Sequence, residues 1–197
     1  MELSEIQNSV SVEEVRYSND GTVTLSLSDN RKLKLALEKW HQLGQPLKKK
    51  LSDKEQQVLE QESCFTLIRT KMLSFLARRE HSVEELRRKI KQNPSIFKID
   101  DSSELIERCL LEMQEKGFQS DDRFTRQYIE SKLANKPHGP LKILAGLFNR
   151  GISKELANKV LNELGNQELW LNKSIEWLDK IQKKGKPLTP QVLSQKL

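Results

Sequence analysis

Cysteine is nearly absent from this chain of 197 residues, which contains only Cys64 and Cys109. Because the two thiols lie far apart and no paired ligand spacing surrounds them, the sequence excludes a disulfide framework, a zinc ribbon and a paired-cysteine redox motif. Both cysteines fall on apolar helical stripes. We therefore expect them to be buried and unreactive.

Long hydrophobic runs are missing as well, since no stretch of about 18 apolar residues occurs. The first residues, Met1-Glu2-Leu3-Ser4-Glu5, lack the basic start and the apolar run of a signal peptide. Glycine and proline are few, with 8 and 6 residues, which excludes collagen-like and linker-dominated chains. We expect a globular cytoplasmic protein without a membrane segment.

Positively charged residues are in modest excess over negatively charged ones. The 34 Lys and Arg residues against 28 Asp and Glu residues give a net charge of +6 and an isoelectric point near 9.2. This excess favours an acidic protein surface or a nucleic acid as the partner, and it does not choose between them.

Apolar residues recur at every second position near the start of the chain, the period of a strand with one buried face. They predict three short strands of an antiparallel meander between residues 9 and 37, carried by Val10, Val12, Val23, Leu25, Leu27, Leu33, Leu35 and Leu37. Asn19-Asp20-Gly21 and Ser28-Asp29-Asn30 supply the turns. Because three strands alone are marginally stable, we expect Trp40, Leu43 and Leu47 to cover the apolar face.

From position 52 onward the apolar period is helical, and helix start signals recur at similar intervals. Ser52-Asp53-Lys54-Glu55 and Asp101-Ser102-Ser103-Glu104 have the form of capping boxes, and Ser153-Lys154-Glu155 supplies a third start. We predict a mainly α-helical protein, with a β-meander extension and linker (1–51) before three tandem three-helix repeats (52–99, 100–152 and 153–197) in a curved array. The predicted helices are 53–61, 63–79, 82–92, 102–116, 121–135, 140–150, 154–164, 167–183 and 190–197.

Internal similarity supports the repeats. Residues 76–86 can be laid without gaps on residues 133–143, so that Leu86 falls on Ile143, and the same register places Ile90 on Leu147. Residues 189–197 resemble the same closing helix.

The sequence offers no catalytic constellation. His81 and His138 occupy equivalent positions before a closing helix, where a cap or turn role is favoured over catalysis. The pair Asp121-Asp122 follows Ser120, where acids favour a helix start and neighbouring side chains point apart. No metal-ligand spacing and no glycine-rich phosphate loop occurs. We expect no enzyme activity, no metal and no cofactor.

Cations gather around the predicted helix that follows Ser82. Its buried stripe would be Val83, Leu86 and Ile90, which leaves cations on or beside the exposed side. These cations, with two just upstream, are Arg78, Arg79, Arg87, Arg88 and Lys91. Two interpretations stay open: a binding surface, or ordinary surface pairs in which Glu84 meets Arg88 and Glu85 meets Lys89.

Two segments resemble the RecX family of bacterial recombination regulators: FLARREHSVEEL at 75–86 and GFQSDDRFTRQY at 117–128. The pattern continues through Gly139-Pro140-Leu141-Lys142-Ile143, Leu147 and Arg150-Gly151-Ile152, so the resemblance covers about 52–197. The meander with Gly44-Gln45-Pro46-Leu47 resembles an extension that some members carry. Lys136-Pro137-His138-Gly139 departs from the family's more glycine-rich approach to the closing helix, and the third repeat is degenerate.

The resemblance implies a helical protein that binds the groove of the RecA filament on single-stranded DNA. There it would inhibit filament extension, ATP hydrolysis, strand exchange and co-protease activity, acting as a monomer with at most weak direct contact with DNA. Leu76, Leu86 and Phe124 would be scaffold, and the partner-binding residues would be the five cations above with Arg123 and Arg126. The alternative is a DNA-binding regulator that uses tandem helix-turn-helix-like modules.

Overall fold

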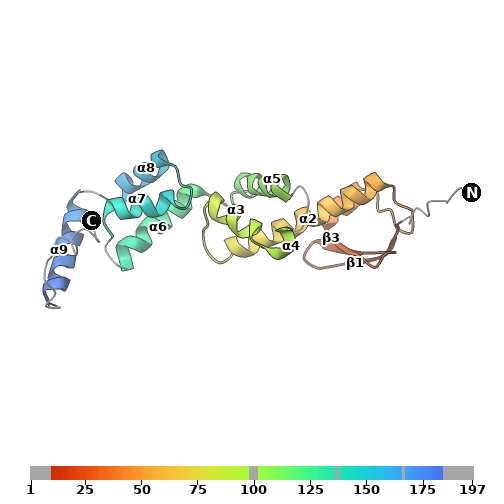
Figure 1. Cartoon of the computed structure of the whole chain (residues 1–197), viewed down its shortest axis with the longest axis horizontal. Coiled ribbons are helices and arrows are strands. Elements are labelled where there is room, and N and C mark those ends of the chain that lie inside the picture. Colours follow the sequence, from red (N-terminus) through yellow and green to blue (C-terminus); the bar gives the residue numbers. More distant parts are fainter. Residues whose placement is uncertain (1–9, 98–101, 136–137, 166, 184–197) are drawn as a thin grey trace, which may run out of the picture. The chain divides into compact units, whose positions relative to one another are not determined.

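The computed structural model describes residues 10–97, 102–135, 138–165 and 167–183. It is mainly helical with a small antiparallel sheet, which confirms the predicted fold class (Figure 1). The chain divides into two compact units, which we call unit 1 (Met1–Ser74 with Ile90–Cys109) and unit 2 (Phe75–Lys89 with Leu110–Leu197).

The sheet of unit 1 is the predicted meander. Strands β1 (Val12–Tyr17), β2 (Thr22–Leu27) and β3 (Lys32–Ala36) pair antiparallel in the order β1-β2-β3. Leu25 is the central position, because it lies opposite Val15 on one side and Leu33 on the other. The first turn forms because Asp20 accepts a hydrogen bond from the amide of Thr22 at 3.1 Å and Gly21 adopts a φ of +74°.

The apolar face of the sheet is covered by helix α1 (Leu37–Gln42) and by the start of helix α2 (Asp53–Leu76). Trp40 is buried there and Leu43 packs against it half-buried, whereas Leu47 is 48% exposed and does not belong to this core. The buried cluster consists of Val10, Val12, Val23, Leu25, Leu27, Leu35, Trp40, Leu51 and Leu59. The sheet therefore needs a residue of α2 to complete its core.

The segment after α1 runs along the free side of β1. The amide of Lys48 donates to the carbonyl of Val12 at 2.8 Å, and the amide of Leu51 donates to the carbonyl of Val10 at 2.9 Å. The side chains of Lys48, Lys49 and Lys50 in this segment are exposed. Its backbone, however, is paired with the strand.

Helix α2 is one continuous helix, so the predicted break between 61 and 63 is wrong. No glycine or proline occurs within it, and its only start signal is the capping box, in which Ser52 N donates to Glu55 at 2.8 Å and Glu55 N donates to Ser52 Oγ at 3.3 Å. The other helices are α3 (Val83–Lys91), α4 (Pro94–Phe97), α5 (Ser102–Glu115), α6 (Asp121–Asn135), α7 (Pro140–Phe148), α8 (Lys154–Leu164) and α9 (Gln167–Lys183). Asp101 and the predicted helix 190–197 lie outside the described residues. None of the described helices is long and apolar enough to cross a membrane.

Helices α6, α7 and α8 pack around one core in unit 2. Its buried residues are Phe124, Ile129, Ile143, Leu147, Ile152, Ala157, Val160 and Leu161. The predicted second repeat, 100–152, groups α6 and α7 with α5 and not with α8. The boundaries of the three repeats stay a prediction. Leu86 and Ile90 are fully buried and Phe124 is 3% exposed, as expected of scaffold residues, while Leu76 is half-buried.

Candidate partner-binding surface

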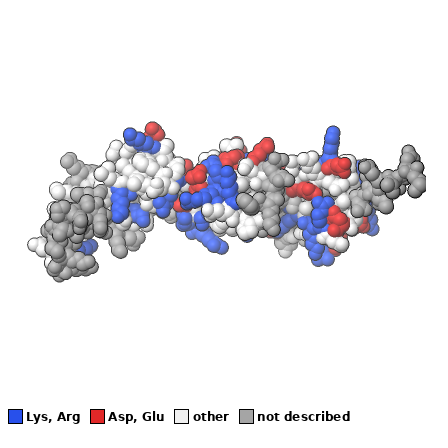
Figure 2. All heavy atoms as spheres, viewed as in Figure 1, with Lys and Arg blue, Asp and Glu red and all other residues white. Residues whose placement is uncertain are grey.

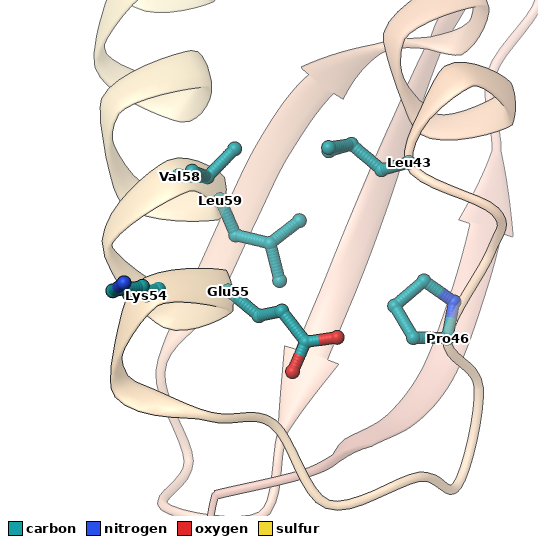
Figure 3. Close-up of a pocket in the computed structure, with 6 residues that line it drawn as sticks. All are labelled: Leu43, Pro46, Lys54, Glu55, Val58 and Leu59. Carbon is teal, nitrogen blue, oxygen red and sulfur yellow. The ribbon is translucent and has the colours of Figure 1, made fainter.

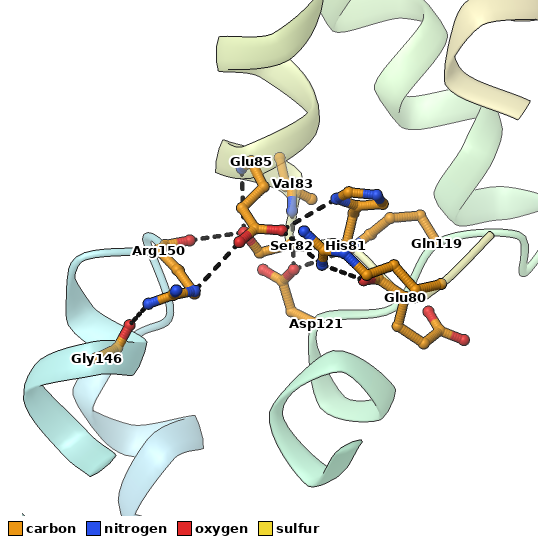
Figure 4. Close-up of polar contacts among 10 residues, drawn as sticks. Glu80, His81, Ser82, Val83, Glu85, Gln119, Asp121, Gly146 and Arg150 are labelled. Atoms are coloured by element: carbon orange, nitrogen blue, oxygen red, sulfur yellow. Dashed lines mark hydrogen bonds and ion pairs between the residues drawn. The ribbon is translucent and has the colours of Figure 1, made fainter. Parts of the chain in front are cut away.

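Helix α3 begins at a serine that forms hydrogen bonds in two directions (Figure 4). Ser82 Oγ accepts from the amide of Glu85 at 3.1 Å, which caps the helix, and donates to the carbonyl of Arg150 at 2.7 Å. The next amide, that of Val83, donates to Asp121 Oδ1 at 3.0 Å. The start of α3 is thus attached both to the first residue of α6 and to the turn after α7.

Glu85 is a buried carboxylate surrounded by donors. Its Oε2 accepts hydrogen bonds from Arg79 Nη1 and His81 Nδ1, both at 3.0 Å, and its Oε1 lies 3.2 Å from Arg150 Nε. Burial raises the pKa of Glu85, but hydrogen bonding to Arg79, the charge of Arg79 and the contact with His81 outweigh burial, so its pKa lies below the usual value. The carboxylate is therefore ionised and paired inside unit 2.

His81 completes this network and is only 2% exposed. Burial and the nearby charge of Arg79 lower the pKa of His81 despite the opposing effect of Glu85, so the imidazole is neutral near pH 7. Because an ionised carboxylate can only accept, Nδ1 of His81 must carry the proton. Gln119 Nε2 donates to the carbonyl of His81 at 3.1 Å and so fixes the turn from the other side. The histidine has a structural role before α3 and is not accessible to an external substrate.

The turn after α7 approaches α3 so closely that it requires glycine. Gly151 has a φ of +77°, and a Cβ placed on it would lie 2.5 Å from the Cβ of Glu84. Arg150, just before it, also donates from Nη1 to the carbonyl of Gly146 at 2.7 Å. The part of α3 that lies in unit 2 is therefore held firmly in place, and so are the side chains on its exposed side.

Four of the predicted binding residues form ion pairs inside the chain. Arg79 pairs with Glu85, and Arg87 pairs with Glu84. Arg123 Nε lies 2.8 Å from Glu80, and its Nη2 donates to the carbonyls of Gly117 and Phe118 at 2.9 and 3.0 Å. Arg126 Nε lies 2.7 Å from Asp122 Oδ2, and Arg126 Nη2 lies 2.6 Å from Glu163 Oε2. The hydrogen bonds to these two carboxylates raise the pKa of Arg126. These arginines already have anionic partners.

The other three predicted cations are Arg78, Arg88 and Lys91, all exposed. Within the part of the chain that the structure describes, none of the three has an ion-pair partner. The predicted ion pair between Glu84 and Arg88 does not form, because Glu84 pairs instead with Arg87, which lies three residues after it. Figure 2 shows Lys and Arg side chains gathered over α3, with acidic side chains beside them. We call Arg78 and Arg88, which both belong to unit 2, the free arginines.

Other sites that could carry chemistry are weak. An apolar hollow of about 170 Å³ in unit 1 is lined by Leu43, Pro46, Lys54, Glu55, Val58 and Leu59 (Figure 3), and its one carboxylate, Glu55, serves the capping box. Cys64 and Cys109 are both buried, and burial raises the pKa of the Cys64 thiol. Among the described residues, no group of His, Cys, Asp and Glu side chains could hold a metal ion.

The buried network could not be predicted as a unit from the sequence. Glu85 and Arg150 are far apart in the chain, and Glu85 carries the i,i+4 spacing to Lys89 that is typical of a solvated pair. The one local signal was the serine at 82 with an acid three residues later, which has the spacing of a capping box.

Comparison with known proteins identifies the family. A family model described as "RecX, second three-helix domain" matches residues 120–161, which contain α6, α7 and most of α8. The chain is 36% identical over 108 residues to the regulatory protein RecX of Legionella pneumophila, a match that covers 55% of this chain and 66% of that protein. It is 35% identical over 133 residues to the regulatory protein RecX of Escherichia coli, and this match covers 62% of this chain and 72% of that protein.

A solved structure described as the crystal structure of regulatory protein RecX has the same fold. The TM-score is 0.69 at 17% identity, over 95% of this chain and 89% of that one. The fold, the matched three-helix domain and the extent of the identity lead to one assignment: the chain belongs to the RecX family of regulatory proteins.

Proposed function

We propose that this protein regulates the RecA recombinase. It would bind in the groove of the RecA filament on single-stranded DNA and limit filament extension, ATP hydrolysis, strand exchange and co-protease activity. In this proposal it is a cytoplasmic monomer that uses no cofactor and catalyses no reaction. The support is membership of the RecX family together with a surface that carries exposed positive charge.

The observation that carries the proposal is the division of cations around α3. The buried carboxylate Glu85 pairs with Arg79 and Arg150 and fixes the helix, whereas Arg78 and Arg88 are exposed and have no ion-pair partner among the described residues. An arginine that is not paired internally can form charge-assisted hydrogen bonds with carboxylates or phosphates of a partner. The free arginines are therefore the first residues that we assign to the filament contact, with Lys91 next.

The ion-paired arginines take a secondary place in this proposal. Arg123 and Arg126 would have to exchange an internal carboxylate for a partner's, and that exchange gains little net free energy. Arg79 and Arg87 are limited in the same way. We therefore expect their contribution to binding to be smaller than that of the free arginines.

The test is a titration of the protein into the DNA-dependent ATPase reaction of RecA. The wild-type protein should inhibit, and Arg78→Glu with Arg88→Glu should need at least tenfold more protein for half inhibition, because each reversal replaces attraction by repulsion at the contact. Lys48→Glu with Lys50→Glu, which reverses two exposed lysines in unit 1, is the matched control and should inhibit like wild type. Full inhibition by the arginine variant would remove this surface from the interface.

The alternative of a DNA-binding regulator makes a different prediction. Such a protein would bind duplex or single-stranded DNA without RecA, with an affinity that falls steeply as salt rises. Tight RecA-independent binding in a gel-shift assay at about 150 mM salt, together with no effect on the ATPase, would favour that alternative.

A further inference from the structure

Helix α7 presents an apolar face to solvent. Leu141 is 72% exposed and Phe148 is 43% exposed, and both lie on the same side of the helix as the exposed Ala145, at positions i, i+4 and i+7. The opposite side carries Ile143 and Leu147, which are buried in the core of α6, α7 and α8. The helix is thus apolar on both sides, although a helix at a protein surface normally has a polar outer side.

The same outer positions of α3 are charged. When Leu86 is placed on Ile143 and Ile90 on Leu147, Glu84 corresponds to Leu141 and Arg88 corresponds to Ala145. Lys91 corresponds to Phe148 in the same register. Two helices with equivalent buried residues therefore present different chemistry at these outer positions: those of α3 can attract anions, whereas those of α7 can bury apolar surface.

The sequence around α7 favours a partner that carries acidic groups. Between Glu130 and Glu155 the chain contains no acidic residue, whereas this stretch contains Lys132, Lys136, Lys142 and Lys154, besides Arg150, which pairs with Glu85. An apolar face set in a cationic segment is complementary to an apolar patch with acidic side chains at its rim. It is a poor fit for nucleic acid, because Leu141 and Phe148 can neither neutralise phosphates nor donate hydrogen bonds to them.

A second copy of this chain is a weaker candidate for the occupant. Leu141 and Phe148 together expose on the order of 200 Å² of side chain, since a whole phenylalanine buries only about 150–250 Å². A stable specific interface needs about 800 Å² from each partner. In addition, two copies would bring two cationic segments together. The face is adequate as one part of a contact whose other part is elsewhere.

We propose that the outer face of α7, formed by Leu141, Ala145 and Phe148, docks on an apolar patch with an acidic rim on a RecA subunit. This rests on the proposed function and deepens it, because it divides the contact between two helices of unit 2. The free arginines provide the electrostatic attraction, and α7 provides the desolvated apolar contact.

The experiment compares two pairs of substitutions in the full chain. Leu141→Ser with Phe148→Ser should melt like wild type and need at least tenfold more protein to half-inhibit the RecA ATPase. The matched control, Leu171→Ser with Ile175→Ser, removes two apolar side chains of α9 that are 61% and 48% exposed, and should inhibit like wild type. If the double variant does not fold, Leu141→Ser alone serves, because this side chain is largely in solvent.

Salt separates the roles of the two helices. The Leu141→Ser and Phe148→Ser variant should lose a similar factor at about 50 and 200 mM salt, whereas the free-arginine variant should lose more at low salt. Wild-type inhibition by the α7 variant would overturn the inference while leaving the proposed function intact. An equal loss of inhibition in the α7 variant and in the α9 control would also overturn it. So would light scattering that detects a dimer of the wild-type protein that Leu141→Ser disrupts. Absence of inhibition by the wild-type protein would instead contradict the proposed function.

Discussion

The hydroxyl of Tyr128 on α6 occupies the space that a side chain on Gly146 of α7 would need. A Cβ placed on Gly146 would overlap that oxygen and would lie 3.1 Å from Tyr128 Cζ. The tyrosine ring is held by stacking on Phe124 and by the guanidinium of Arg150, 4.8 Å from the ring centroid. The absent side chain therefore lets the Tyr128 ring of α6 pack against α7, where the ring contacts the same Arg150 that pairs with Glu85.

Gly146→Ala should destabilise the protein, although alanine is the better helix former by about 1 kcal/mol. The overlap with Tyr128 forces the ring to move, and overpacking of this kind costs about 1–3 kcal/mol. Urea unfolding would measure the loss. Tyr128→Phe removes the overlapping oxygen, so the double variant should recover part of the stability. A Gly146→Ala protein as stable as wild type would show that the ring moves without cost.

Stability should fall in mild acid because of His81. The pKa of His81 in the folded protein lies below 6.5, so the unfolded chain takes up this proton more readily. The stability due to the neutral imidazole is complete above about pH 6.5 and is lost as the pH falls through that value towards the folded pKa. The lowered pKa of Glu85 adds a second loss at still lower pH.

His81→Gln isolates this effect, because glutamine cannot take up the proton. In urea unfolding at several pH values between about 7.5 and 5.5, the free energy of unfolding of wild type should decrease more steeply than that of the variant. His41 and His138 are present in both proteins and cancel in the comparison. Parallel curves would show that His81 titrates alike in the folded and unfolded states.

Leu86→Ala should lower the free energy of unfolding by about 2–5 kcal/mol, because Leu86 is fully buried and its truncation leaves a cavity. Leu171→Ala is the control: that side chain is 61% exposed, and its loss should change stability by less than about 0.5 kcal/mol. Chemical denaturation of the two variants provides the comparison. Similar effects at both positions would contradict the burial of Leu86.

Truncation before residue 52 should leave a folded but less stable helical fragment. Leu59 of α2 is 2% exposed because it completes the core of the sheet, and removal of the sheet leaves this leucine in solvent. In the full chain Leu59→Ala should cost about 2–5 kcal/mol, whereas in the 52–197 fragment it should cost almost nothing. Circular dichroism during urea unfolding would measure both, and a fragment without helical signal would contradict the prediction.

The parts of the fold that depend on local sequence could be predicted. The period-two pattern around Leu25 and the turn at Gly21 gave the meander, and Ser120 and Ser153 gave the starts of α6 and α8. The continuous α2 was missed because the predicted helices were separated at residue 62, where neither a glycine nor a proline interrupts the helix.

The candidate surface could be predicted only in part. The sequence located the cations around α3, but not which of them are paired, because the partners of Arg126 and Glu85 come from distant segments. The apolar face of α7 was visible only as part of a helix of unknown orientation. Burial of Ile143 and Leu147 in three dimensions was needed to show that Leu141 points outward.

The pairing of the linker with β1 has a consequence for behaviour at high concentration. A strand at the edge of a sheet exposes amides and carbonyls that can recruit a strand of another molecule and begin aggregation. In unit 1 the carbonyls of Val10 and Val12 are already occupied by Leu51 and Lys48, and the opposite strand, β3, carries the exposed Lys32 and Lys34. The small sheet is thereby protected on one side by its own linker and on the other by charge, so that it resists growth into intermolecular β-structure.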